Sequence, residues 1–142
     1  MKTVDVDIAI VSRPSDGKVL ICRRKEDTAF AGYWEFPGGK RNPGETADQC
    51  VTRELLEEVA IEVQIVQRLD VVEHDYPTGR IRLHPHLCRH TAGEPQLLGC
   101  QEAIWVDPQA LRQYRFPPAN DDLIARAITR LESLGQPAAD QS

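Results

Sequence analysis

Three carboxylates near the middle of the chain have the spacing that brings side chains together on adjacent turns of a helix. Glu54, Glu57 and Glu58 lie three and four residues apart, and side chains at those separations are neighbours on a helix surface. Like charges about 4 Å apart repel by about 4 kcal/mol at an effective dielectric constant of ~20. A cation must compensate them: either Arg53 or a hard divalent ion such as Mg²⁺ or Mn²⁺, which prefers carboxylate oxygens.

The helical wheel places these carboxylates beside the core. Counting about 100° per residue from Ala47, the apolar stripe of the predicted helix lies between about 40° and 120°. Glu54 then falls at about 340° and Glu58 at about 20°, bordering the stripe, whereas Glu57 falls at about 280°. A merely solvated acidic face would lie opposite the core, so metal binding is the sharper interpretation.

Glycines immediately before this helix strengthen the interpretation. Gly38, Gly39 and Gly44 allow backbone amides and carbonyls to approach an ion or a phosphate closely. A glycine pair alone most often marks a turn. Its position next to an acidic helix favours a ligand-binding loop.

The segment from residue 39 to residue 61, GKRNPGETADQCVTRELLEEVAI, resembles the Nudix box, whose pattern is G, five residues, E, seven residues, then REUxEExGU with U apolar. The matching residues are Gly39, Glu45, Arg53, Glu54, Leu55, Glu57, Glu58 and Ile61. Ala60 is the single departure, because the family usually has Gly there. If the left-handed cap conformation is kept, Ala should cost up to about 1 kcal/mol.

The resemblance to the Nudix family extends beyond the box, to roughly residues 4–131. The segment WEFPGGK at residues 34–40 is similar to the strand and loop of the MutT-like branch, Arg23-Arg24 to its basic pair, and FPPAN at residues 116–120 to a segment near its C-terminus. That branch hydrolyses nucleoside triphosphates, notably oxidised guanine nucleotides. The resemblance implies an α/β (α+β) fold, the Nudix-type α/β/α sandwich with a mixed sheet between helices.

The resemblance also implies roles for particular residues. Glu57, Glu58 and the carbonyl of Gly38 or Gly39 would hold Mg²⁺, with Mn²⁺ as a second possibility. Glu54 would assist the metal or take the proton of water, Arg53 would orient the glutamate, and Glu45 would support these groups from behind. The remaining candidates are Glu102 as a further metal ligand, and Arg24, Glu35, Phe36 and Asn120 as substrate-binding residues.

Several candidates have equally plain structural interpretations. Asn120 precedes two aspartates and could cap a helix instead of binding a purine. Glu102 could be an exposed turn residue, and Arg24 could form a surface ion pair. His84 and His86 alternate on a strand but lack neighbouring ligands, so a structural role is expected.

The resemblance implies hydrolysis of a nucleoside triphosphate to the monophosphate and pyrophosphate. An oxidised purine such as 8-oxo-dGTP is the first-choice substrate, and CTP or a modified dCTP is the alternative. A different class of function, a catalytically silent ligand-binding module, is disfavoured because every acidic position of the box is filled.

The elements that must position these residues follow from apolar patterning. We expect a half-buried strand in a hairpin over residues 4–24, a short strand at 34–36, a helix at 46–60, and a strand at 63–72. Another strand should span 80–90, with Pro85 at a sheet edge or a bulge. A strand at 103–106, a short helix at 108–114 and an amphipathic helix at 121–134 complete the prediction: one domain over residues 1–134 and a frayed tail at 135–142.

The composition and charge of the chain exclude some classes of partner. The 142 residues carry a formal net charge of −5, which argues against a nucleic-acid polymer as partner. No apolar stretch approaches the ~18 residues of a membrane span, and the first residues do not resemble a secretion signal. The four cysteines have no CxxC spacing and are expected to be reduced core residues. We therefore expect a cytoplasmic monomer that acts on a small molecule.

Overall fold

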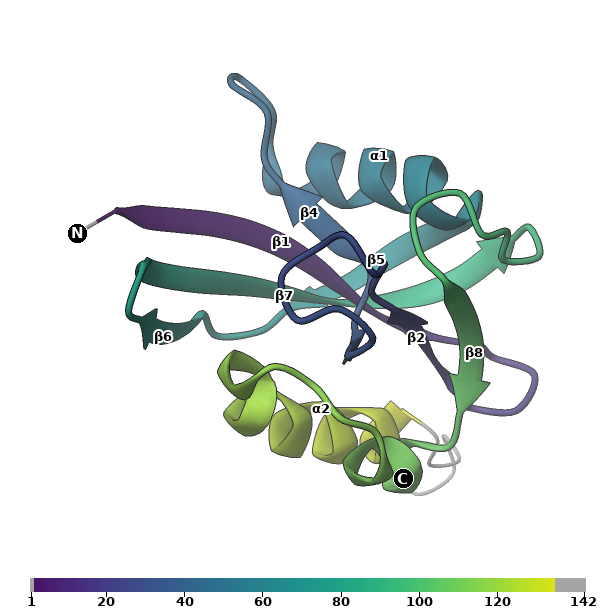
Figure 1. Cartoon of the computed structure of the whole chain (residues 1–142). Helices are drawn as coiled ribbons and strands as arrows, with labels where there is room; N and C mark the ends of the chain where they lie inside the picture. The colour runs from purple at the N-terminus through teal and green to yellow at the C-terminus, as the bar shows by residue number, and fades with distance from the viewer. Residues whose placement is uncertain (1, 135–142) are drawn as a thin grey trace.

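The computed structural model describes residues 2–134 and shows a mixed sheet between two helices (Figure 1). Helix α1 lies over one face of the sheet and helix α2 over the other (Figure 1). The predicted α/β/α sandwich is therefore confirmed. The predicted frayed tail, 135–142, lies outside the described residues. The elements are β1 (Thr3–Ser12), β2 (Val19–Arg23), β3 (Trp34–Glu35), β4 (Gly38–Lys40), α1 (Ala47–Val59), β5 (Glu62–Arg68), β6 (Val72–Tyr76), β7 (Gly79–Ala92), β8 (Glu102–Val106), the 3₁₀ turns η1 (Pro108–Gln113) and η2 (Pro118–Asn120), and α2 (Asp121–Leu134).

The centre of the sheet is a long parallel pair, β1 and β7. These strands pair continuously from Thr3–Arg80 to Ser12–Arg89. The strand order is β3-β2-β1-β7-β5, while β4 pairs with β1, β6 with β7 and β8 with β2. Because β1 carries β4 at its other edge, the glycine segment is fixed directly beside the central strands.

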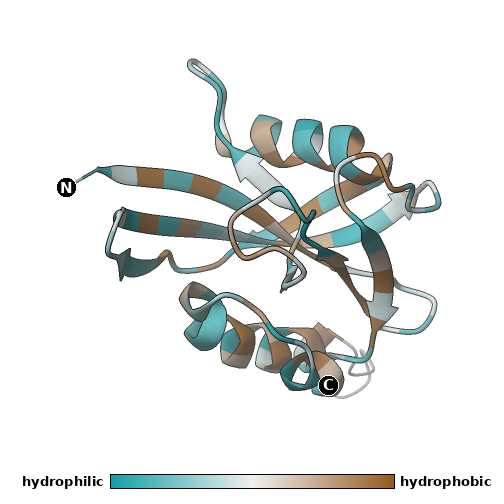
Figure 2. Ribbon diagram, viewed as in Figure 1, coloured by the Kyte–Doolittle hydropathy of each residue, from teal (hydrophilic) through white to brown (hydrophobic). Residues whose placement is uncertain are grey.

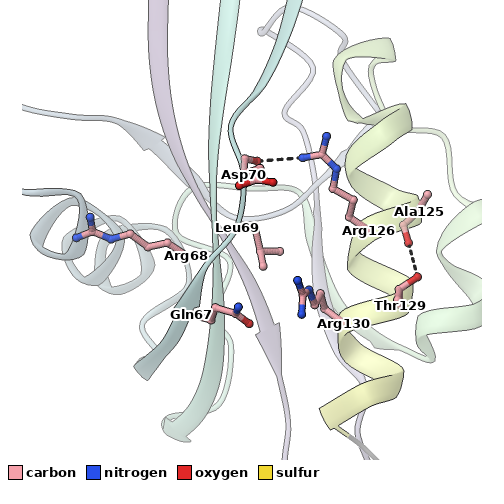
Figure 3. Close-up of a pocket in the computed structure, with 8 residues that line it drawn as sticks. All are labelled: Gln67, Arg68, Leu69, Asp70, Ala125, Arg126, Thr129 and Arg130. Atoms are coloured by element: carbon pink, nitrogen blue, oxygen red, sulfur yellow. Dashed lines mark hydrogen bonds between the residues drawn. The ribbon is translucent and has the colours of Figure 1, made fainter.

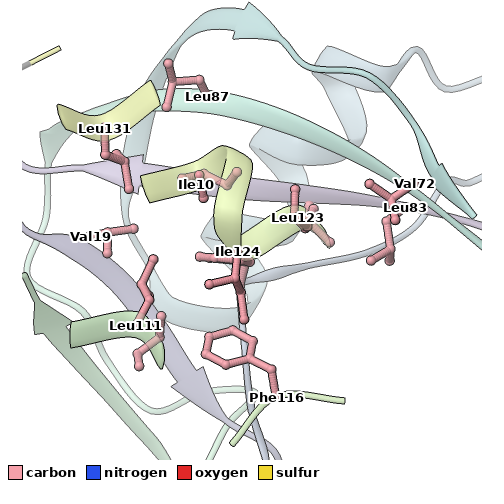
Figure 4. Packing of buried hydrophobic residues seen from close by; sticks show 14 of the residues in the cluster. Ile10, Val19, Val72, Leu83, Leu87, Leu111, Phe116, Leu123, Ile124 and Leu131 are labelled. Carbon is pink, nitrogen blue, oxygen red and sulfur yellow. The ribbon is translucent and has the colours of Figure 1, made fainter. Parts of the chain in front are cut away.

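Alternation along β1 divides the core into two layers. Ile8 and Ile10 face the α2 side, and Ala9 and Val11 face the α1 side. Figure 2 shows the corresponding bands of apolar and polar residues along β1 and β7. Figure 4 shows the α2-side layer, in which residues of α2 pack over the strands. The predicted half-buried strand is thus wrong for its second half, which is buried on both faces because a helix covers each side.

The predicted hairpin is present only at its turn. Strands β1 and β2 pair at Ser12 and Val19 and then separate, since β1 joins β7 and β4 while β2 joins β8 and β3. The predicted strand at 63–72 is also wrong as a single element. It ends at Arg68, and a separate strand, β6, begins at Val72.

Pro85 lies in the central strand β7, so of the two predicted placements, a sheet edge or a bulge, the edge is wrong. The register shifts of the β5–β7 pair fall between Glu62 and Val63 and between Ile65 and Gln67, away from Pro85. Its carbonyl accepts a hydrogen bond from the Leu69 N–H at 2.9 Å, and Leu69 belongs to the connection between β5 and β6. A strand residue directs its N–H and C=O to the same side. The missing N–H of Pro85 therefore faces the gap between two short neighbours, where no ladder hydrogen bond is lost.

Both ends of α1 are defined by local interactions. Thr46 is the N-cap: its hydroxyl accepts from the Gln49 N–H, and the Gln49 side chain accepts from the Thr46 N–H. At the other end Ala60 adopts the left-handed conformation, with φ 58° and ψ 37°. Ala60 therefore adopts the left-handed conformation that glycine usually has at this position, and the alanine side chain makes that conformation strained.

Replacing Ala60 with glycine should stabilise the protein. A left-handed backbone favours glycine, so we expect the free energy of unfolding to rise by up to about 1 kcal/mol. Urea denaturation followed by circular dichroism measures the change. Ala125→Gly, at an exposed position of α2, is the matched control and should instead lower stability by roughly 0.5–1 kcal/mol. Destabilisation by Ala60→Gly would contradict the cap geometry.

Neither α1 nor α2 has the length and apolar character that a membrane-spanning helix needs.

Candidate active site

A cleft of about 580 Å³ opens where α1, β1 and β4 meet. Its lining contains three glutamates of α1 together with groups from six other segments of the chain. The lining residues are Val4, Val6, Arg24, Glu35, Gly38, Gly39, Lys40, Glu54, Glu57, Glu58, Ile81 and Gly99. The three carboxylates singled out by their spacing therefore share one cavity.

The three glutamates differ in burial as the helical wheel predicts. The Glu54 side chain is 18% exposed, Glu58 is 8% exposed, and the Glu57 side chain is 62% exposed. Glu54 and Glu58 thus border the core, whereas Glu57 reaches the mouth of the cleft. The three carboxylates therefore lie at different depths in the cleft, from the exposed Glu57 to the buried Glu58.

Arg53 links the helix to the loop that precedes it. Its guanidinium donates to both Glu45 oxygens, at 2.6 and 2.9 Å, to Glu54 at 2.9 Å and to Glu57 at 3.1 Å. It also donates to the Lys40 carbonyl at 3.1 Å. These bonds lower the pKa of Glu45 to about 2 and raise the pKa of Arg53. One arginine thereby fixes both Glu54 and Glu57 relative to β4.

Glu58 has the most strongly shifted pKa of the groups that line the cleft. Burial, followed by the negative charge of Glu35, raises the pKa of Glu58 to about 8, and the hydrogen bond from the Gly38 N–H, at 3.3 Å, only partly opposes this. A buried carboxyl without a cationic partner is one that a bound cation would stabilise in its charged form. With Glu54 and Glu57 beside it, the all-oxygen donor set fits a hard divalent cation.

Arg24 and Glu35 form an ion pair in the same cleft. Arg24 donates to the Glu35 carboxylate at 2.5 Å and to the Ala29 carbonyl at 2.7 Å. Burial raises the pKa of Glu35, while Arg24 opposes that shift. The predicted pair of substrate-binding residues is therefore brought next to Glu58.

Two positions in β4, Gly38 and Gly39, have no room for a side chain because other atoms lie too close to the backbone. At Gly38, where φ is 153°, a Cβ would lie 2.2 Å from the Asp7 carbonyl oxygen. At Gly39 a Cβ would lie 2.5 Å from the Glu54 carboxyl carbon. The predicted approach of the glycine segment to the acidic helix is found, because these positions leave room for strand β1 on one side and Glu54 on the other.

Three of the candidates neither line the cleft nor bond to its glutamates. Glu102 lies on β8, where it accepts from Arg23 at 2.9 Å. Phe36 is buried in the core against Phe116, with ring centroids 5.2 Å apart. Asn120 is also buried, and its side-chain amide donates to the Pro117 carbonyl at 3.2 Å. None of these side chains lines the acidic cavity.

The capping interpretation of Asn120 is wrong in its details. Asn120 ends the 3₁₀ turn η2, which runs directly into α2, and the Asp121 N–H bonds to the Pro118 carbonyl. The Pro118 carbonyl of η2 therefore satisfies the N–H of the first residue of α2. His84 and His86 have the structural partners expected of them, Asp5 at 2.8 Å and Asp7 at 3.1 Å.

Sequence reasoning missed residues that reach the cleft from distant segments. Val4, Val6 and Ile81 come from the parallel β1–β7 pair, and Gly99 comes from the segment before β8. No local motif marks any of them. The signal that could have identified the first three is the pairing of β1 with β7, which requires knowledge of the sheet order.

A second cleft, of about 470 Å³, lies between the β5–β6 connection and α2 (Figure 3). It contains Arg68, Arg126 and Arg130 but a single carboxylate, Asp70. Arg126 donates to the Asp70 carbonyl at 3.2 Å. This cleft shares no lining residue with the acidic one and offers no comparable set of oxygen ligands for a cation.

The raised pKa of Glu58 predicts how metal-free stability depends on pH. The pKa rises from an ordinary value of 4.5 to about 8 in the folded state, so the folded protein holds a proton that the unfolded chain releases. The stability that Glu58 contributes is therefore fully present below its ordinary pKa and is lost as the pH rises toward about 8, and the pKa of Glu35 shifts in the same direction. At about 1.4 kcal/mol per pKa unit, the loss should reach a few kcal/mol.

Urea denaturation between about pH 5 and pH 8 in chelator tests this prediction. The Glu58→Gln variant is the control, since it removes most of the decline. A stability that rises with pH in this interval, or an equal decline in the variant, would contradict the prediction.

Comparisons with known proteins agree with this geometry. Residues 8–126 match the family model described as the NUDIX domain. The chain is 37% identical to the 8-oxo-dGTP diphosphatase of Haemophilus influenzae, over 89% of this chain and 93% of that protein. It is 34% identical to the CTP pyrophosphohydrolase of Escherichia coli, over 87% and 90% of the two chains. A solved MutT structure from work on Aliivibrio salmonicida and Vibrio cholerae superposes with a TM-score of 0.71 at 31% identity, covering 91% of this chain and 99% of that one. Both the glutamate cluster and these matches lead to one conclusion: the chain belongs to the NUDIX domain family of hydrolases.

Proposed function

We propose that this protein is a Mg²⁺-dependent pyrophosphohydrolase that converts a nucleoside triphosphate to the monophosphate and pyrophosphate. The observation that carries the proposal is the acidic cleft itself. Buried Glu58, with its pKa raised to about 8, lies in one cavity with Glu54 and Glu57. Such a site gains most from a divalent cation, and a triphosphate is an anion that the same cation can bridge.

Three carboxylates would hold the metal. Glu57 and Glu58 would supply oxygens at the mouth and the floor of the cleft, and Glu54 would assist them. Gly38 and Gly39 line the same cleft, so a backbone carbonyl of either could join the set. When bound, Mg²⁺ neutralises phosphate charge and lowers the pKa of water. Mn²⁺ has similar ligand preferences and could replace it.

The chain's own residues then have distinct tasks. Arg53 positions Glu54 and Glu57 by direct hydrogen bonds, and Glu45 holds the other side of the Arg53 guanidinium. Glu54 is the candidate to assist the metal or accept the proton of the attacking water. Arg24 provides a cation for a phosphate oxygen after exchange with Glu35. Positioning and charge neutralisation dominate phosphoryl transfer, so little covalent chemistry is required of the protein.

The first-choice substrate is 8-oxo-dGTP, because a relative named 8-oxo-dGTP diphosphatase aligns over 89% of this chain. The alternative is CTP or a modified dCTP, since a CTP pyrophosphohydrolase aligns at nearly the same identity. Asn120 and Phe36 are too buried to read a base without movement of the α2-side wall. Base preference is therefore assigned by similarity alone.

A panel of triphosphates, assayed for pyrophosphate with Mg²⁺ and with EDTA, tests the proposal. We expect pyrophosphate and nucleoside monophosphate in the presence of Mg²⁺ and no turnover in EDTA. We also expect the highest kcat/KM with 8-oxo-dGTP. Preference for cytosine nucleotides would select the alternative, and orthophosphate with a nucleoside diphosphate as products would reject the proposed bond cleavage.

The proposal includes a small-molecule nucleotide as partner, a monomer in the cytoplasm, and no binding to a nucleic-acid polymer. A ligand-binding module without catalysis is disfavoured because Glu54, Glu57, Glu58 and Arg53 are all present and connected. Binding of nucleotide with no turnover of any triphosphate in the panel would favour that module.

A further inference from the structure

Behind the floor of the acidic cleft lie two thiols that the proposed hydrolysis does not use. The Sγ atoms of Cys22 and Cys100 and a carboxylate oxygen of Glu58 all lie within 4.8 Å of one another. Cys22 is 0% exposed and Cys100 is 3% exposed. Two sulfurs and one oxygen are therefore gathered at a buried position.

Three separate elements bring these atoms together. Cys22 lies on β2 and Glu58 in the last turn of α1, while Cys100 lies in the segment that leads into β8. The Leu98 and Gly99 N–H groups donate to the Glu58 carbonyl, at 3.2 and 2.9 Å. On the other side of Cys100, the Gln101 N–H donates to the Arg23 carbonyl at 2.9 Å. Cys100 is thus fixed by the backbone toward both of its neighbours.

Close packing at Gly99 reinforces this arrangement. A Cβ at Gly99 would lie 2.9 Å from the Glu58 Cγ and 3.2 Å from its Cα. The segment before β8 therefore rests directly on the end of α1. The relative positions of the Cys100 thiol and the Glu58 carboxylate are set by this contact, so the three donors are arranged before any ligand arrives.

We propose that Cys22, Cys100 and Glu58 form a binding site for a thiophilic divalent cation such as Zn²⁺. Tetrahedral zinc takes sulfur at about 2.3 Å and carboxylate oxygen at about 2.0–2.2 Å, and accepts water as a fourth ligand. Such bond lengths place ligand atoms roughly 3.5–4 Å apart, so the observed cluster needs only a small contraction. As each metal–sulfur bond forms, the thiol releases its proton to solvent.

The site adjoins the acidic cleft and differs from the Mg²⁺ site in the softness of its ligands. Glu58 and Gly99 line the acidic cleft, so an ion in the cleft can reach the Glu58 carboxylate, and the two thiols lie within 4.8 Å of that carboxylate. Mg²⁺ prefers oxygen ligands, whereas zinc accepts thiolate sulfur. The inner position therefore selects a softer ion than the outer one.

The consequence for activity rests on the proposed function. Glu58 would belong to both sites, so an ion held by the thiols takes a ligand from the Mg²⁺ site. Zinc should then inhibit hydrolysis in a manner that depends on Cys22 and Cys100. The binding itself does not depend on any hydrolytic activity.

Titration of the metal-free protein with Cd²⁺, a thiophilic substitute for Zn²⁺, tests the binding directly. Cadmium–thiolate bonds absorb in the ultraviolet, and a phosphine reductant keeps the thiols reduced throughout. We expect one equivalent of thiolate-bound Cd²⁺ in the wild-type protein. Cys100→Ser and Cys22→Ser should each weaken binding by at least about 10–100-fold. Competition between the protein and a chromogenic chelator for Zn²⁺ should likewise give a higher affinity for the wild-type protein than for either variant.

Cys88→Ser is the matched control. Cys88 is also fully buried in the α1-side core, but its thiol donates to the His86 carbonyl and lies outside the cluster. Circular dichroism establishes that each variant is folded, and Cys100→Ala serves if a serine variant is not. The control should retain the wild-type Cd²⁺ absorption.

Absence of thiolate absorption in the wild-type protein, or equal absorption in the Cys22 and Cys100 variants, would overturn the site. In the hydrolysis assay, Zn²⁺ at fixed Mg²⁺ should inhibit the wild-type protein at least about tenfold more strongly than Cys100→Ser. Equal inhibition of the two would overturn the shared role of Glu58. If no triphosphate is hydrolysed at all, the optical titration still decides the site, so the two proposals can fail separately.

Discussion

Replacing Glu58 with glutamine should lower the turnover of the triphosphate substrate by about 10³-fold. The substitution keeps the size of a side chain that is 8% exposed and removes the charge that would bind the metal. Because the lost interaction acts where charge develops in the transition state, kcat should fall more than KM changes. Pyrophosphate release at saturating Mg²⁺ measures the effect.

The Glu58→Gln variant should remain folded, since the raised pKa of Glu58 means that its neutral form is already the favoured one in metal-free protein. Glu62→Gln is the control for charge: it changes an exposed carboxylate at the start of β5 and should leave turnover within about twofold. Wild-type turnover by Glu58→Gln would remove Glu58 from the mechanism.

Replacing Arg53 with lysine should lower turnover by about 10²-fold even though the positive charge is kept. Arg53 holds Glu45, Glu54 and Glu57 at the same time through the fixed fork of its guanidinium. A lysine ammonium is a single point and cannot reach three carboxylates and the Lys40 carbonyl together. Steady-state kinetics over a range of Mg²⁺ concentrations measures the loss.

The form of that loss distinguishes positioning from simple stabilisation of the fold. If Arg53 positions metal ligands, the lysine variant requires more Mg²⁺ for half-maximal activity, whereas its melting temperature changes little. Arg68→Lys is the control, because Arg68 forms one exposed ion pair with Asp48 at 3.3 Å. Unchanged Mg²⁺ dependence in Arg53→Lys would show that Arg53 does not act through the metal ligands.

The centre of the site could be predicted from the sequence because it lies within one helix and the loop before it. A wheel with about 100° per residue is sufficient to place Glu54 and Glu58 beside the core and Glu57 at the mouth, and the structure agrees. The left-handed conformation at Ala60 could be predicted for the same reason, because it depends only on the end of this helix. A helix imposes its periodicity on neighbouring residues whatever the tertiary contacts.

Residues contributed by distant strands could not be placed in the same way. The position of Glu102 depends on how β8 pairs with β2, and that register sets it opposite Arg23. Because proline lacks an N–H, the sequence predicts a sheet edge or a bulge at Pro85. The sheet accommodates it in the centre by ending β5 and starting β6 across from it. Such compensation involves pairs of segments and leaves no local pattern.

The burial of β1 on both of its faces also depends on segments that are distant in the sequence. Alternation along β1 indicates one apolar face, yet Ala9 and Val11 are covered by α1 while Ile8 and Ile10 are covered by the α2 side. Phe36, expected to contact substrate, packs instead against Phe116. Sequence periodicity identifies which residues can be buried, but the partner that buries them is decided by the order of the elements in space.

A crystal structure with Mn²⁺ and a non-hydrolysable nucleoside triphosphate, in which anomalous scattering locates the manganese, shows whether the glutamates of α1 bind metal. We expect manganese between carboxylate oxygens of Glu57 and Glu58, with Glu54 close by and phosphate oxygens of the nucleotide completing the coordination. Manganese and triphosphate bound elsewhere, with these three glutamates free of metal, would contradict this expectation.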